Sequence, residues 1–171
     1  WKDVAGVYNA DPRLYPDAVL LPTISYQEAI EMTYFGAKVI HLKTIKPLQA
    51  KNIPLWVKSF IDPGIPGTYF GSENEGNYPP IIIKEKNQIF LTIEPRDFSF
   101  MAEKDLSFLY NVFHEIGFQV NFIQNTGMNL KLCGNCSFFD ANQLEQILQP
   151  NFSVSIQYDC TLVSIRHYSE E

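Results

Sequence analysis

Cys133 and Cys136 are separated by two residues, which is the spacing of dithiol redox pairs and of half a zinc site. The pair lies between an expected strand and an expected helix, where a thioredoxin-like pair would lie. The aromatic and proline neighbours of such redox sites are missing, and no second cysteine pair completes a zinc tetrahedron. Two small residues in a turn are therefore the default interpretation, a redox module stays open as a weaker alternative, and we expect no bound metal.

Charged residues in the first part of the chain have both a functional and an ordinary structural interpretation. Asp3 and Asp11 are common turn-forming residues. Lys38 follows an expected helix end, where a cation is favoured by the helix dipole. His41 is interpreted as a core histidine without a catalytic role. These residue types alone do not define a site, because a site also depends on the helices and strands that position them.

The composition indicates a folded protein with one domain or two small ones. The chain has 171 residues, of which 46% are hydrophobic and 19% charged, with a formal net charge of -6. An acidic chain has no field that attracts nucleic acid or anionic membranes, and no apolar run approaches the roughly 20 residues that span a bilayer. Three cysteines do not make a disulfide framework, so we expect a reducing, cytoplasmic location. Both ends are interpreted as cut, and the chain as a fragment.

Two helices are predicted in the first third of the chain. Ser25 and Glu28 have the spacing of a capping box, in which the Ser25 hydroxyl accepts from the Glu28 amide and the Glu28 carboxylate reaches back to the Ser25 amide. The helix that follows is predicted to end near Gly36. A second helix is predicted over residues 44–49, with Pro47 in or near its first turn.

The middle of the chain contains the best candidate for a domain boundary. Residues 53–57 are predicted to form a buried strand. Residues 59–80 are rich in glycine and proline and poor in apolar residues, which is typical of a linker.

The second half alternates strand and helix patterns in the order β–α–β–β–α–β, which predicts a ferredoxin-like unit. The first helix is predicted to begin with Asp105 as a possible N-cap and to stop at Gly117, and the second to begin at Asp140 and end by Pro150. The predicted strands are 81–83 and 88–93 before the first helix, 118–122 and 128–132 between the helices, and 152–156 and 161–165 after the second helix.

Several segments resemble the aspartokinases, a family with the amino-acid-kinase fold. The chain begins Trp1-Lys2-Asp3, continues Gly6-Val7-Tyr8 and reaches Asp11-Pro12-Arg13, which is similar to the family's nucleotide-site segment except that Lys2 replaces the usual Thr. Further segments match in the family's order: 25–29, 35–41, 52–54 and 67–68 in the catalytic domain, and 88–126, which resembles the first ACT module.

The resemblance implies an α/β (α+β) chain: a C-terminal piece of an amino-acid-kinase fold over residues 1–75, then a ferredoxin-like βαββαβ ACT domain over 81–171 with a truncated second module. It implies a parent enzyme that transfers the ATP γ-phosphoryl group to the aspartate β-carboxylate with Mg2+, as part of lysine, threonine and methionine biosynthesis. The family's Lys-Phe-Gly-Gly-Thr-Ser phosphate segment is absent, so we expect this fragment to be inactive. A fused homoserine dehydrogenase stays open, as does a non-catalytic amino-acid-binding regulator.

The resemblance also assigns nucleotide-binding residues. Lys2 and Asp3 match the pair near the base, Tyr8 and Arg13 line the ATP site, and Lys38 lies close to the phosphates. Cations such as Arg13 and Lys38 would stabilise charge on a migrating phosphoryl group.

ACT modules bind small amino acids between the loop before their first helix and the following strand, and pair as homodimers. The matching residues here are Phe98, Met101, Asp105, Gln119, Val120, Asn121, Gln124, Asn125 and Thr126. Amide side chains can hold both the ammonium and the carboxylate of an amino acid, although a merely polar strand face is an equal alternative. Lysine-inhibited relatives have Asp at the position of Asn121 and Glu near Gly127. Both carboxylates are missing here, so lysine is not a safe effector, and threonine or no effector stays open. We expect a homodimer formed near residues 119–132.

Overall fold

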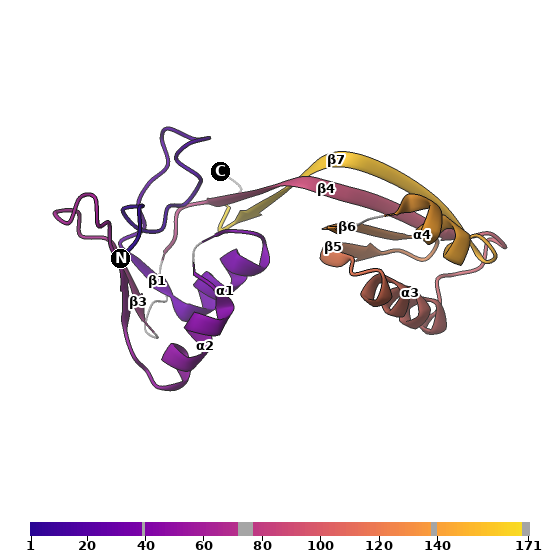
Figure 1. The fold of residues 1–171 in the computed structure, drawn as a ribbon, viewed down its shortest axis with the longest axis horizontal. Coiled ribbons are helices and arrows are strands. Elements are labelled where there is room, and N and C mark those ends of the chain that lie inside the picture. The colour runs from indigo at the N-terminus through magenta and orange to yellow at the C-terminus, as the bar shows by residue number, and fades with distance from the viewer. Residues whose placement is uncertain (39, 72–76, 138–139, 169–171) are drawn as a thin grey trace. The chain divides into compact units, whose positions relative to one another are not determined.

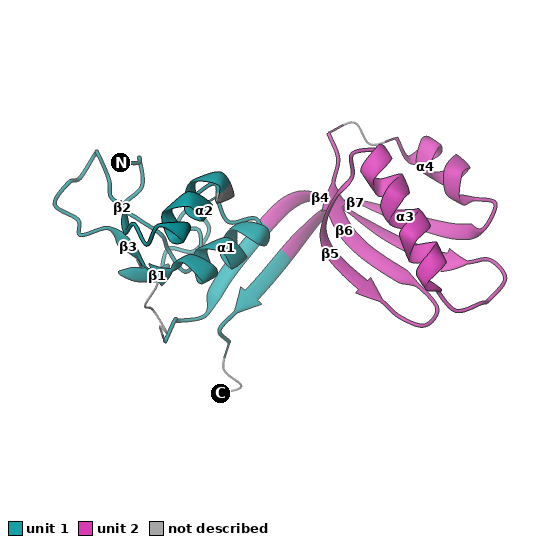
Figure 2. Ribbon diagram, turned by 90° about the horizontal axis from the view of Figure 1, so that it is seen from below, with its two compact units in different colours: residues 1–84, 163–171 teal, residues 85–162 magenta. Residues whose placement is uncertain are grey.

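The computed structural model describes residues 1–38, 40–71, 77–137 and 140–168. The ends of the two predicted domains at residues 75 and 171 lie outside this range. The chain divides into two compact units, one of Trp1–Lys84 with Val163–Glu171 and one of Glu85–Leu162 (Figure 2). No helix in the described part of the chain is both long and apolar enough to cross a membrane.

The first unit contains a three-stranded sheet in the order β1-β3-β2 (Figure 1). Strand β1 (Thr23–Ser25) pairs in parallel with β3 (Thr68–Gly71), and β2 (Leu55–Val57) pairs with β3 in antiparallel fashion. The glycine- and proline-rich segment 59–80 therefore holds the central strand of this sheet, and Phe70 on it is fully buried. The strand is too short to give a strong sequence pattern, which is why the segment looked like a linker.

The prediction of a buried strand over 53–57 is wrong in part. Only residues 55–57 form β2, and Trp56 is 55% exposed while Val57 is buried. An edge strand buries one face, so alternate apolar residues on it remain at the surface.

Helix α1 (Tyr26–Tyr34) begins and ends where the sequence predicts. The Ser25 hydroxyl accepts a 3.0 Å hydrogen bond from the Glu28 amide, which confirms half of the capping box. The other half is wrong: the Ser25 amide donates to Tyr78 Oη at 2.9 Å, and the Glu28 carboxylate accepts from Arg166 instead. Gly36 has a φ of 98° and closes the helix with the paired hydrogen bonds of a Schellman motif.

Helix α2 (Leu42–Ala50) begins two residues before the predicted start. The interpretation of His41 as a core histidine is wrong: it is exposed and is the N-cap of this helix, and its Nδ1 accepts a 3.1 Å hydrogen bond from the Lys43 amide. Pro47 lies inside the helix rather than in its first turn. Its missing N–H removes one internal hydrogen bond from α2.

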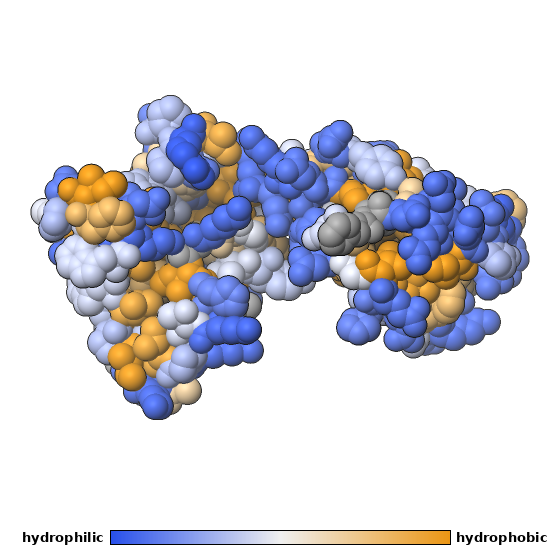
Figure 3. All heavy atoms as spheres, in the orientation of Figure 1, coloured by the Kyte–Doolittle hydropathy of each residue, from blue (hydrophilic) through white to orange (hydrophobic). Residues whose placement is uncertain are grey.

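The second unit has the predicted ferredoxin-like topology. Its sheet has the order β5-β6-β4-β7, so the first and third of its four strands lie side by side at the centre. The elements are β4 (Ile81–Pro95), α3 (Glu103–Glu115), β5 (Gln119–Asn125), β6 (Leu130–Asn135), α4 (Ala141–Leu148) and β7 (Phe152–Arg166). Both helices contribute to one buried apolar cluster with the sheet, and hydrophobic side chains also gather on the visible surface over α3 and α4 (Figure 3).

Strands β4 and β7 are each continuous where the sequence predicted two strands. The polar residues that interrupt the apolar pattern are accommodated by left-handed backbone at Asn87 (φ 59°) and Asp159 (φ 55°). Asn and Asp tolerate this conformation better than other side chains do, so the strand continues past them. Both strands contribute residues to both compact units.

The predicted N-cap of helix α3 is also wrong. Ala102 is the capping residue, and Asp105 lies three residues later, where its Oδ2 accepts a 3.0 Å hydrogen bond from the Ala102 amide. The predicted stop at Gly117 is confirmed, with a φ of 68°. Asp140 is confirmed as the N-cap of α4, accepting from the Asn142 amide at 2.9 Å.

Candidate functional site

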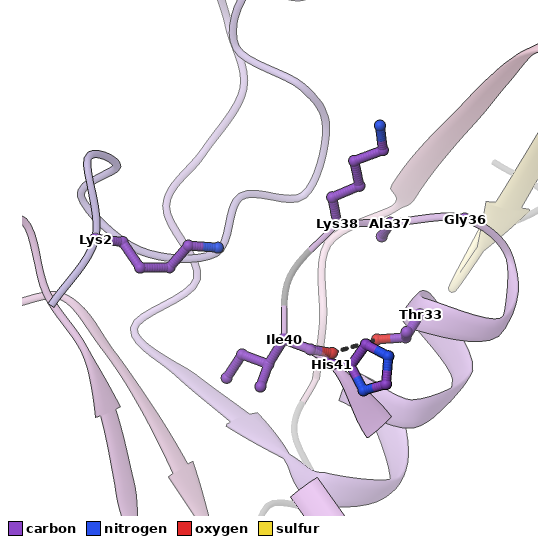
Figure 4. Close-up of a pocket in the computed structure, with 7 residues that line it drawn as sticks. All are labelled: Lys2, Thr33, Gly36, Ala37, Lys38, Ile40 and His41. Atoms are coloured by element: carbon purple, nitrogen blue, oxygen red, sulfur yellow. Dashed lines mark hydrogen bonds between the residues drawn. The ribbon is translucent and has the colours of Figure 1, made fainter. Parts of the chain in front are cut away.

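A hollow of about 530 Å3 lies at the C-terminal end of α1 (Figure 4). It is lined by Lys2, Thr33, Gly36, Ala37, Lys38, Ile40 and His41. These residues come from the start of the chain, from the last turn of α1 and from the segment that leads into α2. The hollow therefore brings together two of the five residues expected to bind nucleotide.

Backbone hydrogen bonds hold Lys2 and the residue before Lys38. The Lys2 amide donates to the Lys58 carbonyl at 2.9 Å, and the Phe60 amide donates to the Lys2 carbonyl at 2.9 Å, so Lys2 is tied to the segment after β2. The Ala37 amide donates to the Met32 carbonyl at 2.9 Å, which turns the chain sharply before Lys38.

The hollow is suited to an anion. Two lysines belong to its lining, no acidic side chain does so among the described residues, and the N-terminal end of α2 adds a partial positive charge beside His41. In Figure 4 the Lys2 side chain extends toward the segment that carries Lys38, while the Lys38 side chain points away from Ile40 and His41. Two flexible cations around an open hollow can adjust to a phosphate group.

The other three predicted nucleotide residues do not line the hollow. Tyr8 forms an isolated antiparallel bridge with Leu20. Arg13 donates from Nε and Nη2 to the two carboxylate oxygens of Asp11, at 3.0 and 2.8 Å. This hydrogen-bonded pairing with Asp11, followed by a smaller contribution from the charge of Asp3, raises the pKa of the Arg13 guanidinium above its ordinary value. Asp3 therefore acts on Arg13 through its charge.

The expected effector residues fall into a loop group and a strand group. In the loop group, the Met101 amide donates to the Gly127 carbonyl at 3.1 Å, which joins the loop before α3 to the turn after β5. Thr126 uses its hydroxyl group in hydrogen bonds to Asn129, and Phe98 is 85% exposed with a φ of 57°.

Asn121 is used inside the unit. It lies at an irregularity of β5 between Val120 and Phe122, and its Nδ2 donates to Glu85 Oε2 at 3.0 Å and to Gln88 Oε1 at 2.9 Å. Gln88 is only 1% exposed. The remaining amides of β5, on Gln119, Gln124 and Asn125, are exposed.

The cysteine pair does not have the features of a redox centre. Cys133 is buried in β6, and its burial, followed by the charges of Cys160 and Glu85, raises the pKa of its thiol above the ordinary value. A thiol held protonated is a poor nucleophile. Within the residues that the structure describes, no group of three His, Cys, Asp or Glu side chains is placed to hold a metal ion.

No local pattern in the sequence indicates the charged cluster around Glu28 in the first unit. Arg166, Glu31 and His167 surround its carboxylate. Arg166 lies 138 residues from Glu28 along the chain, so only the fold brings them together.

Comparison with known proteins finds similarity over parts of the chain. The amino acid kinase family matches residues 1–59. The bifunctional aspartokinase/homoserine dehydrogenase of Haemophilus influenzae is 60% identical over 68 residues, which cover 40% of this chain and 8% of that protein. Aspartokinase 3 of Arabidopsis thaliana is 29% identical over 152 residues, which cover 85% of this chain and 26% of that protein. The chain is related to the aspartokinases.

The fold of the aspartokinases supports the same relationship. The crystal structure of E. coli aspartokinase III in complex with lysine and aspartate matches 96% of this chain and 38% of its own, with a TM-score of 0.81 and 26% identity. The same enzyme in complex with aspartate and ADP matches with a TM-score of 0.82. The predicted fold class is thus confirmed, and the chain spans well under half of the length of these aspartokinases.

Proposed function

We propose that this chain carries part of the ATP site and an amino-acid-sensing ACT domain of an aspartokinase, which transfers the ATP γ-phosphoryl group to the β-carboxylate of L-aspartate. Residues 1–75 represent the C-terminal part of the catalytic domain, and residues 81–171 the regulatory region. The observation that carries the nucleotide half is the hollow that Lys2 and Lys38 line together. A purely regulatory protein would have no need of a segment that matches the amino acid kinase family.

Both lysines fit a role in holding phosphate oxygens. An ammonium group forms charge-assisted hydrogen bonds to such oxygens, and these are stronger than bonds between neutral groups. Lys38 would contact the phosphates, while Lys2, with Asp3, Tyr8 and Arg13, would border the rest of the nucleotide. Mg2+ would arrive with the nucleotide, because this ion is bound mainly through substrate phosphates and waters.

The regulatory half is proposed to bind a small amino acid. The exposed amides Gln119, Gln124 and Asn125, with the loop around Phe98 and Met101, offer donors and acceptors for an ammonium and a carboxylate. Asn121 is neutral and already engaged, so this site lacks the extra carboxylate that would favour lysine over threonine. A homodimer through residues 119–132 completes the proposal.

A thermal-shift panel tests both halves. The chain is heated with Mg-ATP, lysine, threonine or methionine in large excess, as wild type, as Lys38→Ala and as the matched control Lys43→Ala on α2. A ligand at about a hundred times its dissociation constant adds roughly 2.7 kcal/mol to the folded state, which gives a measurable shift. We expect the Mg-ATP shift to disappear in Lys38→Ala and to remain in Lys43→Ala, with any amino-acid shift unchanged in both.

The same panel can contradict the proposal in two separable ways. A Mg-ATP shift that survives Lys38→Ala would remove the hollow as the phosphate site. The absence of a shift with every amino acid would remove the sensing role of residues 81–171 in this chain.

A further inference from the structure

A buried ion pair joins the end of strand β7 to helix α1 within the first unit. Arg166 Nε donates to Glu28 Oε1 at 2.7 Å and its Nη2 to Glu28 Oε2 at 3.0 Å, so the guanidinium and the carboxylate meet through two parallel hydrogen bonds. A third bond runs from Nη1 to Glu31 Oε2 at 3.2 Å. Glu28 is 6% exposed, and its buried charge therefore depends on Arg166 for compensation.

The same cluster contacts the N-terminal end of α1. His167 Nε2 lies 3.0 Å from Glu28 Oε2, and the ring of His167 packs against that of Tyr78 with 5.0 Å between centroids. The Tyr78 hydroxyl accepts the hydrogen bond from the amide of Ser25, the N-cap of α1. The start of the helix is thus held by residues around the end of β7.

The cluster also contacts the C-terminal end of α1. The guanidinium of Arg166 lies over the ring of Phe35, 5.7 Å from its centroid. Phe35 is the C-cap of α1, and the next three residues, 36–38, line the hollow. One arginine therefore holds both the first turn of α1 and the residue from which the phosphate-site segment departs.

Strand β7 extends from Phe152 to Arg166 without interruption. Its residues up to Leu162 belong to the ferredoxin-like unit, and those from Val163 belong to the first unit.

We propose that Arg166 is a positioning residue for the phosphate-binding hollow. It holds α1 so that the segment carrying Lys38 keeps its conformation. This inference rests on the proposed function, in which Lys38 binds phosphate. Arg166 does not line the hollow and would act only through α1.

Amide hydrogen exchange of the 171-residue chain, measured without nucleotide, tests this role. In Arg166→Gln we expect exchange of residues 35–38 to rise about tenfold more than exchange of the β1-β3-β2 sheet. Arg166→Lys keeps the charge and loses the two-pronged geometry, so it should fall between the wild type and Arg166→Gln. The matched control is Arg96→Gln, whose Nε donates to the carbonyls of Gln149 and Phe152, and it should change exchange in the second unit only.

Two results would overturn the proposal. Exchange that rises evenly through residues 1–84 would show that Arg166 merely stabilises the unit, and unchanged exchange at 35–38 would show that it does not position the segment. Should Arg166→Gln fail to fold, Arg166→Lys and Glu31→Gln, which removes only the partly exposed arm of the cluster, give the same distinction. Because the exchange is measured without nucleotide, its result can be interpreted even if the chain fails to bind nucleotide.

Discussion

The polar side chains of the candidate sites in the two units have different surroundings. In the first unit, Lys2 and Lys38 line an open hollow. In the second unit, Asn121 is held by Glu85 and by the buried Gln88, and thus serves the packing of the unit. Residue type predicts the chemistry that a side chain can perform, while burial decides whether its hydrogen bonds are already committed.

The first and largest effect is expected from breaking the Glu28–Arg166 pair. Among the described residues, Arg166→Met leaves the buried Glu28 carboxylate with only His167 beside it, which should cost the first unit about 3–5 kcal/mol. Both tryptophans, Trp1 and Trp56, belong to this unit, so denaturant unfolding followed by tryptophan fluorescence reports its stability directly. A loss of under 1 kcal/mol would mean that the Glu28 charge is compensated by other groups.

Lowering the pH should destabilise the first unit less than Arg166→Met does, because protonation neutralises Glu28 while Arg166 stays in place. Burial alone would raise the pKa of Glu28, but the hydrogen bonds from Arg166 and His167 outweigh burial and hold this pKa below its ordinary value of 4.5. The unfolded chain then binds more protons than the folded one as pH falls below that value. The stabilisation from Glu28 is therefore present above pH 4.5 and is lost as pH falls through the folded-state pKa.

Denaturant midpoints measured between pH 3 and 7 check this expectation. Below pH 4.5, the denaturant midpoint of the tryptophan-reported transition should fall less steeply with pH in Glu28→Gln than in the wild type. Equal slopes in the two proteins would show that other carboxyl groups control the acid sensitivity of the first unit.

In the second unit, we expect substitutions of two amide side chains of β5, those of Asn121 and Gln124, to have unequal effects on stability. Asn121→Leu removes the amide donor to the buried Gln88 Oε1 and should cost about 1–3 kcal/mol, because in the described part of the chain this oxygen is left with only a weak 4.0 Å contact from the Cys133 thiol. The exposed Gln124→Leu should stay within about 0.5 kcal/mol. Thermal unfolding of both variants measures the difference, and equal losses would contradict the distinction between committed and available amides.

The smallest effect is expected at a helix cap. Ser25→Ala removes the acceptor of the Glu28 amide and should cost about 1 kcal/mol. Ser155→Ala, on the exposed side of β7, is the matched control and should change little. A loss above 3 kcal/mol for Ser25→Ala would show that the hydroxyl has a role beyond capping α1.

Local patterns in the sequence predicted the elements whose causes are local. Gly36 and Gly117 end their helices as expected, Asp140 caps α4, and the alternation of helix and strand patterns gave the ferredoxin-like order. Strand β3 could not be predicted, because four residues between glycines and prolines carry too little periodicity. Asn87 and Asp159 look like turns in sequence, since nothing local shows that both strands continue past them.

The candidate site shows the same limit. Matches to family segments selected Lys2 and Lys38, but nothing in the sequence indicated that Thr33 and His41 would share their hollow or that Arg13 would pair with Asp11. The Arg166 cluster had no sequence signal, since its partners are contributed by α1 and by the end of β7. Long-range contacts between charged residues are set by the fold, and a single sequence does not encode them in any local pattern.

Titration of the isotopically labelled chain with Mg-ADP, followed by two-dimensional amide NMR, tests the central claim most directly. The account predicts that the amide signals of Lys2, Gly36 and Lys38 shift together with one dissociation constant, that those of residues 85–162 stay in place, and that Lys38→Ala abolishes the shifts. No change at these amides up to about 10 mM nucleotide, which corresponds to a binding free energy weaker than about −3 kcal/mol, would contradict it.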